Sequence, residues 1–315
     1  MNGVFLDSLA MDDLDLSPIS SHFKTFTVYP STPSARILER SAGATALIIN
    51  KVRLDRAILT SLPELRLICL VATGSDNIDL AAAHDAGIAV YNCQAYGTDS
   101  VVQHVFTVLL ALHTNLLPYT TDVGAGLWQQ ARQFCLLNHP ITEIRSKRLG
   151  IVGYGTLGQG VADVARAFGM EVLIAARPGT PAVPGRIPLE ALLPQIDVLS
   201  LHCPLTATTR SLIDTAMLCR LQPHAFLINT ARGGIVDEAA LADALRSGRL
   251  AGAAMDVLVK EPPDHDSPLL APDIPNLILT PHIAWASLQA RQRIVEQTAE
   301  NITGFLDDSP VRRIA

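Results

Sequence analysis

Residues 148–170 read RLGIVGYGTLGQGVADVARAFGM, and this stretch decides the fold of the second half of the chain. Gly153, Gly155 and Gly158 follow a short apolar run at G-x-G-x-x-G spacing. Apolar residues then recur at helical intervals, and residues 171–175, EVLIA, read as a second strand. A strand, a tight turn, a helix and another strand within about 30 residues are typical of a dinucleotide-binding unit.

Each glycine has a separate role in that interpretation. Gly153 lets the chain turn sharply after the strand, Gly155 lets a pyrophosphate approach backbone N–H groups, and Gly158 lets the helix pack closely on the strand. Thr156 and Leu157 lie at the helix N-terminus, whose unpaired N–H groups would face the phosphates. The alternative is an ordinary glycine-rich α/β turn, and the strand-turn-helix-strand context favours the dinucleotide site.

Composition narrows the class of protein. A chain of 315 residues, 49% hydrophobic and 17% charged, has the length for about two domains with large cores. The net charge of −6, with scattered basic residues, argues against nucleic acid as a partner. Five cysteines without a C-x-x-C pair indicate reduced thiols in the cytoplasm. We find no secretory signal and no apolar run of membrane-spanning length, and we expect no metal site.

Strand and helix patterns alternate along the whole chain. In the first part, apolar runs separated by helical patterns occur at residues 4–6, 26–29, 46–49, 67–72 and 88–91. From the glycine loop on, about six strands are predicted, the later ones near residues 171–176, 198–201, 225–229, 250–255 and 277–279. This alternation predicts α/β folding with parallel sheets and helices on both faces.

A long apolar helix is predicted between these two parts. Asp99 and Ser100 look like the N-cap of a helix over residues 101–117, which Pro118 ends. A helix this apolar is buried on most sides, between two domains or against a second subunit. The polar segment 127–146, which carries two large aromatic side chains, is consistent with an arm that packs on another chain.

The segment ATGSDNID, residues 72–79, follows a predicted strand, at the edge where open α/β sheets bind ligands. Gly74 would let backbone N–H groups turn outward as an anion-binding nest. A plain strand-to-helix turn capped by Asp76 or Asp79 explains the same residues equally well.

Three polar segments follow predicted strands in the second half of the chain: NTARGGIVD (229–237), MDVLVKEPP (255–263) and TPHIAW (280–285). Arg232 is followed by two glycines, and a guanidinium at this sheet edge can hold a carboxylate by two hydrogen bonds. Glu261 is followed by two prolines.

Taken alone, Glu261 is typical of an exposed loop carboxylate and His282 of a structural histidine, and a surface ion pair is the alternative for Arg232. Together they favour chemistry on a carbonyl group. Hydride transfer to a carbonyl requires a proton donor that works near neutral pH, which suits imidazole. It also requires a carboxylate to orient that imidazole and a cation to bind the substrate and polarise its carbonyl.

These segments, with the glycine loop, residues 72–79 and LHCPL (201–205), resemble D-isomer-specific 2-hydroxyacid dehydrogenases over essentially the full chain. Within that family the loop ATGSDNID (72–79) and the helix start AYGTDSVVQH (95–104) look most like those of bacterial hydroxypyruvate reductases, or glycerate dehydrogenases. The resemblance implies two doubly wound parallel-sheet domains with the active-site cleft between them. The smaller, flavodoxin-like substrate-binding domain would comprise residues 1–99 and 286–315, and the Rossmann-type dinucleotide-binding domain residues 100–285.

The resemblance also implies roles for the polar residues. Arg232 would bind the substrate, His282 would act as the acid–base catalyst, and Glu261 would be its partner. Backbone N–H groups around Thr73 and Gly74 would bind the substrate carboxylate.

The remaining roles implied by the resemblance concern the cofactor and the assembly. Asp256 would hold the nicotinamide carboxamide, and further cofactor contacts would come from Cys203, Thr230, Ala231, His282 and Ala284. Family members are usually homodimers joined through their nucleotide domains. The implied reaction is the NAD(P)H-dependent reduction of a small 2-keto acid, such as hydroxypyruvate or glyoxylate, to the D-2-hydroxy acid, and its reverse.

One departure from the pattern concerns the choice of cofactor. An acidic residue that binds the adenosine 2′-hydroxyl is expected at the end of the second strand, about 20 residues after the glycines. Residues 175–178 read AARP instead, so no carboxylate is present and Arg177 can bind a 2′-phosphate. This favours NADP over NAD.

Two other functions fit the same fold. One is a dinucleotide-sensing interaction protein, like the corepressors built on this fold, and the intact Arg, Glu and His set argues against it. The other is a dehydrogenase for a different small donor, such as an inorganic or one-carbon compound.

Overall fold

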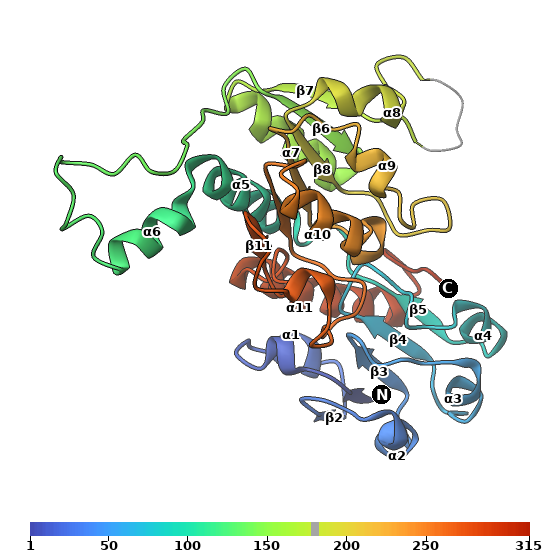
Figure 1. Ribbon diagram of the computed structural model, residues 1–315. Helices are drawn as coiled ribbons and strands as arrows, with labels where there is room; N and C mark the ends of the chain where they lie inside the picture. Colours follow the sequence, from blue (N-terminus) through green and yellow to red (C-terminus); the bar gives the residue numbers. More distant parts are fainter. Residues whose placement is uncertain (178–182) are drawn as a thin grey trace. The chain divides into compact units, whose positions relative to one another are not determined.

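The computed structural model describes residues 1–177 and 183–315 and contains two compact units. Unit 1 consists of Met1–Gly97 and Ala286–Ala315, and unit 2 consists of Thr98–Trp285. Both units are labelled along the chain in Figure 1, and each is described below by itself.

Unit 1 is built on a parallel five-stranded sheet with the order β2-β1-β3-β4-β5, which is the flavodoxin-like order. The strands are β1 (Asn2–Phe5), β2 (Thr25–Val28), β3 (Ala46–Ile49), β4 (Leu67–Leu70) and β5 (Ala89–Tyr91). The helices are η1 (Leu9–Met11), α1 (Ser17–Ser20), η2 (Ser34–Arg36), α2 (Ile37–Ser41), α3 (Arg56–Thr60), α4 (Leu80–Asp85) and α11 (Leu288–Leu306).

The central strands of unit 1 are buried on both faces, as the continuous apolar runs predict. All four residues of β3 and of β4 are buried, and Leu47 and Ile49 belong to one core with residues of α2, α3 and α4. The C-terminal helix α11 packs beside α1 and against β4. The last residues of the chain return to this sheet through an antiparallel bridge between Tyr91 and Arg313.

Unit 2 is built on a parallel six-stranded sheet with the order β11-β10-β9-β8-β6-β7. The strands are β6 (Arg148–Val152), β7 (Glu171–Ile174), β8 (Val198–Leu201), β9 (Phe226–Asn229), β10 (Gly252–Met255) and β11 (Leu277–Leu279). The helices are α5 (Thr98–Thr114), α6 (Leu116–Gly124), α7 (Thr156–Ala167), α8 (Leu189–Leu192), η3 (Leu193–Gln195), α9 (Thr215–Leu218), η4 (Gly233–Ile235), α10 (Glu238–Arg246) and η5 (Pro268–Leu270).

Ile187 occupies the place of one further strand at the edge of this sheet. It forms a parallel bridge with Ala175, just after β7. If this bridge is counted as a short strand, the order becomes that of a Rossmann fold, with the β6 strand at the centre. The number of strands from the glycine loop on and the α/β class both agree with the prediction.

Helices cover both faces of the unit 2 sheet and form two cores (Figure 1). One core joins α5 and α7 to Leu149 and Ile151 of β6, and the other joins α8, α9 and α10 to Val152 and to Leu199 of β8. Because successive strand residues point to opposite faces, β6 contributes to both cores.

The apolar helix α5 is buried along most of its length, as predicted, but both of its predicted ends are wrong. It begins at Thr98, so Ser100 lies inside the first turn, where its hydroxyl donates to the carbonyl of Ala284 at 2.7 Å. It ends before Asn115, which takes a left-handed φ of 49°. Pro118 does not break a helix but lies in the first turn of α6, where its missing N–H would have had no intrahelical partner.

Among the described residues, no single helix is long and apolar enough to cross a membrane. The pair formed by α5 and α6 passes that test only when both are counted together, and the two are bent by 62° at the break.

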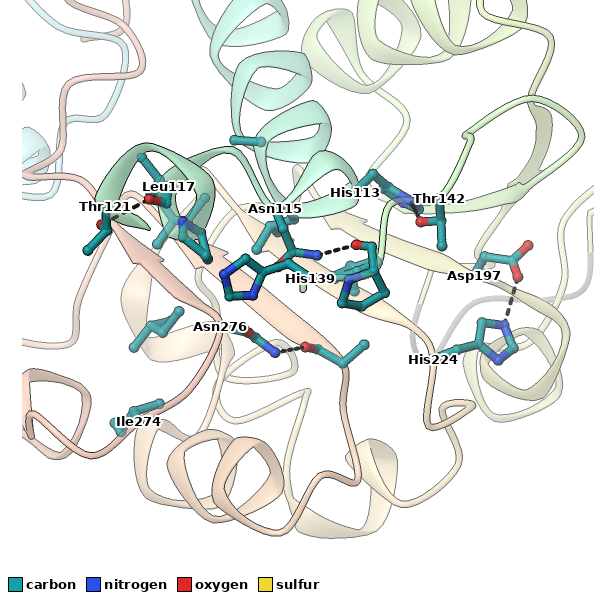
Figure 2. A pocket seen from close by; sticks show the side chains of 18 of the residues that line it. His113, Asn115, Leu117, Thr121, His139, Thr142, Asp197, His224, Ile274 and Asn276 are labelled. Atoms are coloured by element: carbon teal, nitrogen blue, oxygen red, sulfur yellow. Dashed lines mark hydrogen bonds and ion pairs between the residues drawn. The ribbon is translucent and has the colours of Figure 1, made fainter. Parts of the chain in front are cut away.

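A cavity of about 830 Å³ lies at the amino-terminal edge of the unit 2 sheet (Figure 2). Its walls are residues at the starts of the strands, among them Lys147, Asp197 and Phe226, together with the end of α5, helix α6 and residues 139–142. None of the predicted site residues lines it, because those residues follow the carboxyl ends of the strands. We therefore assign it no part in the chemistry.

His113, the penultimate residue of α5, is a buried histidine on the wall of this cavity. Its Nδ1 lies 2.7 Å from the Thr142 hydroxyl, and its ring packs on Phe226 at a centroid distance of 4.6 Å. Burial, assisted by the positive charge of Lys147, lowers the pKa of His113 from 6.5 to about 4. The folded protein therefore holds this ring neutral.

This pKa predicts a specific pH dependence of stability. The unfolded chain binds a proton at this residue below about pH 6.5, whereas the folded chain does so only near pH 4. Neutral His113 therefore lowers the free energy of unfolding only when the pH falls below about 6.5. The loss grows toward pH 4 and is about 2 kcal/mol at pH 5. Urea denaturation at pH 7.5 and pH 5 gives the loss of unfolding free energy for each protein. The loss should be smaller in His113→Leu than in the wild type by about 2 kcal/mol. Identical losses would contradict this assignment.

Candidate functional site

Two glycines of the loop between β6 and α7 are required by the fold itself. Gly153 has a φ of 93°, and a Cβ atom there would lie 2.5 Å from the backbone nitrogen of Cys203. A Cβ atom on Gly158 would lie 2.1 Å from the carbonyl oxygen of Gly153. Any larger residue at either position would force the strand, the helix and the β8 loop apart.

Gly155 differs from both, because the protein itself does not require a glycine there. Its φ is −84°, which any residue adopts, and no described atom lies within 4 Å of where its Cβ would be. Gly155 is the N-cap residue of α7, and no side chain of the described residues caps that helix. The open backbone at Gly155 and the first-turn N–H groups, which include those of Thr156 and Leu157 and have no partner within the helix, fit a dinucleotide pyrophosphate.

The loops after β8 and β9 supply further groups at this edge. Cys203 is buried, and burial raises the pKa of its thiol. Its neighbour His202 bonds the Ser200 hydroxyl at 2.8 Å, and burial lowers its pKa to about 4, so it is neutral. The Thr230 hydroxyl oxygen is buried and has no hydrogen-bond partner among the described residues, so it can bond a ligand.

Arg232 lies on a tight turn at the end of β9. Buried Asn229 holds this turn, because its side-chain oxygen accepts from the Ala231 N–H at 3.0 Å and its amide donates to the Arg232 carbonyl at 2.9 Å. The Arg232 guanidinium donates to the Ala231 carbonyl at 2.7 Å and is otherwise exposed at the sheet edge. Asn229 begins the NTARGG segment, but its role as a clamp could not be inferred from the sequence.

Gly233 joins the Arg232 turn to the segment that carries Glu261. A Cβ atom on Gly233 would lie 1.9 Å from the carbonyl carbon of Leu258, so the two backbones touch. In the same segment the Leu258 N–H donates to Oε1 of Glu261 at 2.9 Å. The loops that follow the neighbouring strands β9 and β10 are thus packed together.

Glu261 and His282 form a close pair. Oε2 of Glu261 lies 2.5 Å from Nδ1 of His282, and both side chains remain about one third exposed, at 35% and 31%. Because Nδ1 faces the carboxylate, Nδ1 carries a proton and Nε2 is the nitrogen that can exchange a proton with a ligand. The structure therefore brings together two of the three residues that sequence analysis grouped.

Asp256, at the end of β10, is almost completely buried and bonds the loop that carries His282. Its Oδ1 accepts from the Ile283 N–H and its Oδ2 from the Ala284 N–H, both at 2.9 Å, while its backbone carbonyl accepts from the His282 N–H at 2.8 Å. Oδ1 also accepts from the Thr280 hydroxyl at 2.5 Å. The sequence predicted a cofactor contact for Asp256 but did not indicate these hydrogen bonds to the His282 loop.

Thr73 and Gly74 belong to unit 1, in the loop between β4 and α4. The Thr73 hydroxyl donates to the carbonyl of Cys93 at 2.8 Å, and the Asn92 amide donates to the carbonyl of Thr73 at 2.8 Å. Asp79 caps α4, as one of the two predicted alternatives requires, by accepting from the Ala82 N–H at 2.8 Å. Capping by Asp79 leaves the anion-nest prediction for Gly74 untested.

The end of β7 carries no acidic side chain. Ala175 forms the bridge to Ile187, Ala176 donates its N–H to the Ile187 carbonyl at 2.7 Å, and Arg177 is exposed. Pro178, the last residue of the predicted cofactor-selecting segment, lies outside the described residues.

Comparison with known proteins identifies the family of this chain. The model of the D-isomer specific 2-hydroxyacid dehydrogenase NAD-binding domain matches residues 106–284. A glycerate dehydrogenase of Methylorubrum extorquens is 42% identical over 311 residues, covering 98% of this chain and 96% of the relative. A hydroxypyruvate reductase of Blautia hydrogenotrophica is 34% identical over 284 residues, covering 89% of this chain and 88% of the relative.

Among solved structures, an acyclic imino acid reductase in complex with NADPH and D-Arg superimposes with a TM-score of 0.88 at 28% identity, with complete coverage of both chains. The matched NAD-binding domain and the fit of the glycine loop support a nicotinamide dinucleotide as the cofactor of this protein. These matches and the site geometry confirm the resemblance found in the sequence: the chain belongs to the D-isomer specific 2-hydroxyacid dehydrogenase family.

Proposed function

We propose that this protein reduces a small, polar 2-keto acid of the hydroxypyruvate or glyoxylate type to the D-2-hydroxy acid and catalyses the reverse oxidation. The observation that carries the proposal is the 2.5 Å contact between Glu261 Oε2 and His282 Nδ1 at the carboxyl edge of the unit 2 sheet. The names of the relatives, glycerate dehydrogenase and hydroxypyruvate reductase, support this substrate class.

Each polar residue then has a defined task. Glu261 keeps the Nδ1 proton on His282, so that Nε2 gives a proton to the substrate oxygen during reduction and takes it back during oxidation. Arg232 binds the substrate carboxylate and stabilises the charge that develops on the carbonyl oxygen. Backbone N–H groups around Thr73 and Gly74 bind the same carboxylate. The bound dinucleotide supplies or accepts the hydride.

In the same proposal, residues 1–99 with 286–315 bind the substrate and residues 100–285 bind the dinucleotide. Gly153, Gly155, Gly158 and the first turn of α7 face the pyrophosphate, and Thr230, whose hydroxyl is buried without a partner among the described residues, bonds the cofactor. Further contacts come from Cys203, Ala231, Asp256, His282 and Ala284. Steady-state rates with a panel of 2-keto acids test the proposal, and hydroxypyruvate or glyoxylate should have the highest kcat/KM.

We further propose that the cofactor is NADP rather than NAD. Ala175 and Ala176 at the end of β7 have no carboxylate that would accept from the 2′-hydroxyl of NAD or repel a 2′-phosphate. Arg177 follows directly and is exposed, so its guanidinium can reach a phosphate. A charge-assisted hydrogen bond of this kind contributes roughly 1.5–3 kcal/mol.

The wild type should therefore prefer NADPH over NADH by about 10- to 100-fold in kcat/KM. Ala176→Asp combined with Arg177→Ala should reverse the preference, because the new carboxylate accepts from the ribose hydroxyls and repels the phosphate. Both cofactors are compared at one salt concentration, since screening weakens the phosphate contact. Equal efficiencies or an NADH preference in the wild type would mean that Arg177 only stacks on the adenine.

We propose, in addition, that two copies associate through unit 2. Figure 1 shows α6 and the segment after it extending away from the sheet of that unit. Large apolar side chains that are at least 42% exposed gather on this segment: Leu116, Leu117, Val123, Leu127, Trp128, Phe134, Leu137 and Ile141. A second copy that covers them would remove this apolar surface from water.

The five free cysteines support a cytoplasmic location.

Sedimentation measures this association directly. The wild type should sediment at about twice the mass of the 33.7 kDa chain, and Trp128→Ser combined with Phe134→Ser should shift it toward one chain. Leu9→Ser, which changes an exposed leucine of unit 1, is the matched control and should leave the mass unchanged. A wild type that sediments as a single chain at micromolar concentration would refute the dimer.

A further inference from the structure

His104 of α5 is connected to the His282 loop through a chain of hydrogen bonds within unit 2. Its Nε2 lies 3.1 Å from the Thr280 hydroxyl oxygen and 3.7 Å from Oδ1 of Asp256. The Thr280 hydroxyl is in turn 2.5 Å from the same Oδ1. Asp256 is buried and the other two side chains are partly buried, with exposed fractions of 15% for His104 and 1% for Asp256.

The direction of these hydrogen bonds follows from the number of available protons. A threonine hydroxyl has one proton, and Thr280 donates it to Asp256. The Thr280 oxygen can therefore only accept from His104, so the His104 ring carries its proton on Nε2. The result is a one-way chain in which His104 donates to Thr280 and Thr280 donates to Asp256.

Asp256, whose carboxylate accepts from Thr280, also bonds the backbone around His282. Its carboxylate and carbonyl oxygens accept the N–H groups of residues 282, 283 and 284. His282 has a left-handed φ of 56°, which is unfavourable for a residue with a side chain and persists only where the surroundings hold it. Trp285 adds one more constraint, since its indole N–H donates to the His282 carbonyl at 3.0 Å.

We propose that His104 and Thr280 are positioning residues for His282. Their hydrogen bonds hold the Asp256 carboxylate in the orientation that accepts from the N–H groups of residues 283 and 284. These bonds in turn hold the His282 backbone where the imidazole contacts Glu261. The proposal rests on the proposed role of His282 in proton transfer, and it adds a residue 178 positions earlier in the chain to that machinery.

A purely structural role for His104 makes a different prediction. If His104 only fills space between α5 and the sheet, a leucine of similar volume would serve as well, and the Thr280 hydroxyl would matter little. If it positions His282, the donor at Nε2 matters. Glutamine, whose amide nitrogen reaches a similar place, should then replace histidine, whereas leucine should not.

The first measurement is kcat and KM with hydroxypyruvate and NADPH. A displacement of about 1 Å in a reacting group costs up to about 100-fold in rate, so His104→Leu and Thr280→Val should each lower kcat by about tenfold or more. KM for hydroxypyruvate should change by less than about threefold, because Arg232 and the loop of Thr73 and Gly74, which would bind its carboxylate, are held by other hydrogen bonds. His104→Gln and Thr280→Ser should keep at least about half of the wild-type kcat. The double variant His104→Leu/Thr280→Val should be little worse than either single variant, because both interrupt one chain.

His113→Leu is the matched control. It makes the same substitution on the same helix at a buried histidine that bonds Thr142 at the other edge of the sheet. It should leave kcat within about twofold of the wild type. Thermal unfolding of each variant shows whether a lower kcat comes from an unfolded protein or from a displaced His282. If His104→Leu does not fold, the comparison of Thr280→Val with Thr280→Ser tests the proposal.

The second measurement does not depend on catalysis. Amide hydrogen exchange of residues 282–284 reports the three hydrogen bonds to Asp256, and it should rise by at least about tenfold in His104→Leu and Thr280→Val but not in His113→Leu. Unchanged exchange and kcat in His104→Leu, or an equal loss in His113→Leu, would overturn the proposal. Wild-type kcat in His282→Ala would instead refute the proposed proton transfer, while the exchange data would still test the positioning chain.

Discussion

His282→Ala is expected to lose most of its turnover and still bind the cofactor. Nε2 of His282 is the only nitrogen of this ring left for the substrate, because Nδ1 faces Glu261 at 2.5 Å. Alanine removes both the proton donor and the group that Glu261 orients. General acid–base groups contribute about 10²–10⁴-fold to rate, so kcat for hydroxypyruvate should fall by that factor.

Two further measurements complete this test. NADPH binding, followed by the change in cofactor fluorescence, should stay within a few-fold of the wild type, since the glycine loop and α7 are untouched. His224→Ala is a suitable control, because His224 bonds Asp197 at the opposite edge of the sheet and should leave kcat within about twofold. A reduction rate in His282→Ala equal to that of the wild type across the neutral pH range would exclude the proton-transfer role.

Arg232→Ala is expected to damage both substrate binding and turnover. In the proposed complex the guanidinium contacts the substrate carboxylate in the ground state and the carbonyl oxygen as negative charge develops on it. KM for the keto acid should therefore rise and kcat should fall, with a combined loss in kcat/KM of about 10²–10³-fold, which is typical for removing a donor to a developing oxyanion.

Arg232→Lys separates charge from geometry at the same position. Lysine keeps the positive charge but lacks the planar fork that bonds a carboxylate through two N–H groups. It should recover only part of the lost kcat/KM. Because Asn229 holds the turn through the backbone of residues 231 and 232, neither substitution should disturb the fold, and thermal unfolding checks this. A lysine variant with wild-type kinetics would show that two-point recognition by Arg232 is wrong.

Local sequence patterns predicted the α/β class and the glycine loop because each depends on neighbouring residues. The G-x-G-x-x-G spacing specifies two glycines that the fold itself requires, Gly153 and Gly158, and one that it does not, Gly155. The strand-end segments of Arg232, Glu261 and His282 were found because the carboxyl ends of parallel strands share one edge of a sheet. The carboxyl-terminal end of α5 was predicted wrongly because a left-handed Asn115, which the sequence pattern does not indicate, ends the helix before Pro118.

Long-range contacts could not be predicted in the same way. Asp256 reads in the sequence as a strand-end carboxylate, and only the folded chain shows that it bonds three residues of the His282 loop. His104 looks like one more polar residue on an apolar helix, and its partners Thr280 and Asp256 are more than 150 positions away. The sequence therefore indicates which residues carry the chemistry but not which residues hold them in place.

The most direct test of the proposed reaction is the configuration of its product. Purified protein is incubated with hydroxypyruvate and NADPH, and the glycerate formed is resolved by chiral chromatography. We expect D-glycerate in amounts equal to the NADPH oxidised, because Arg232 and His282 bind one face of the keto acid in a single orientation. L-glycerate, a racemic product, or no turnover with any small 2-keto acid would contradict it.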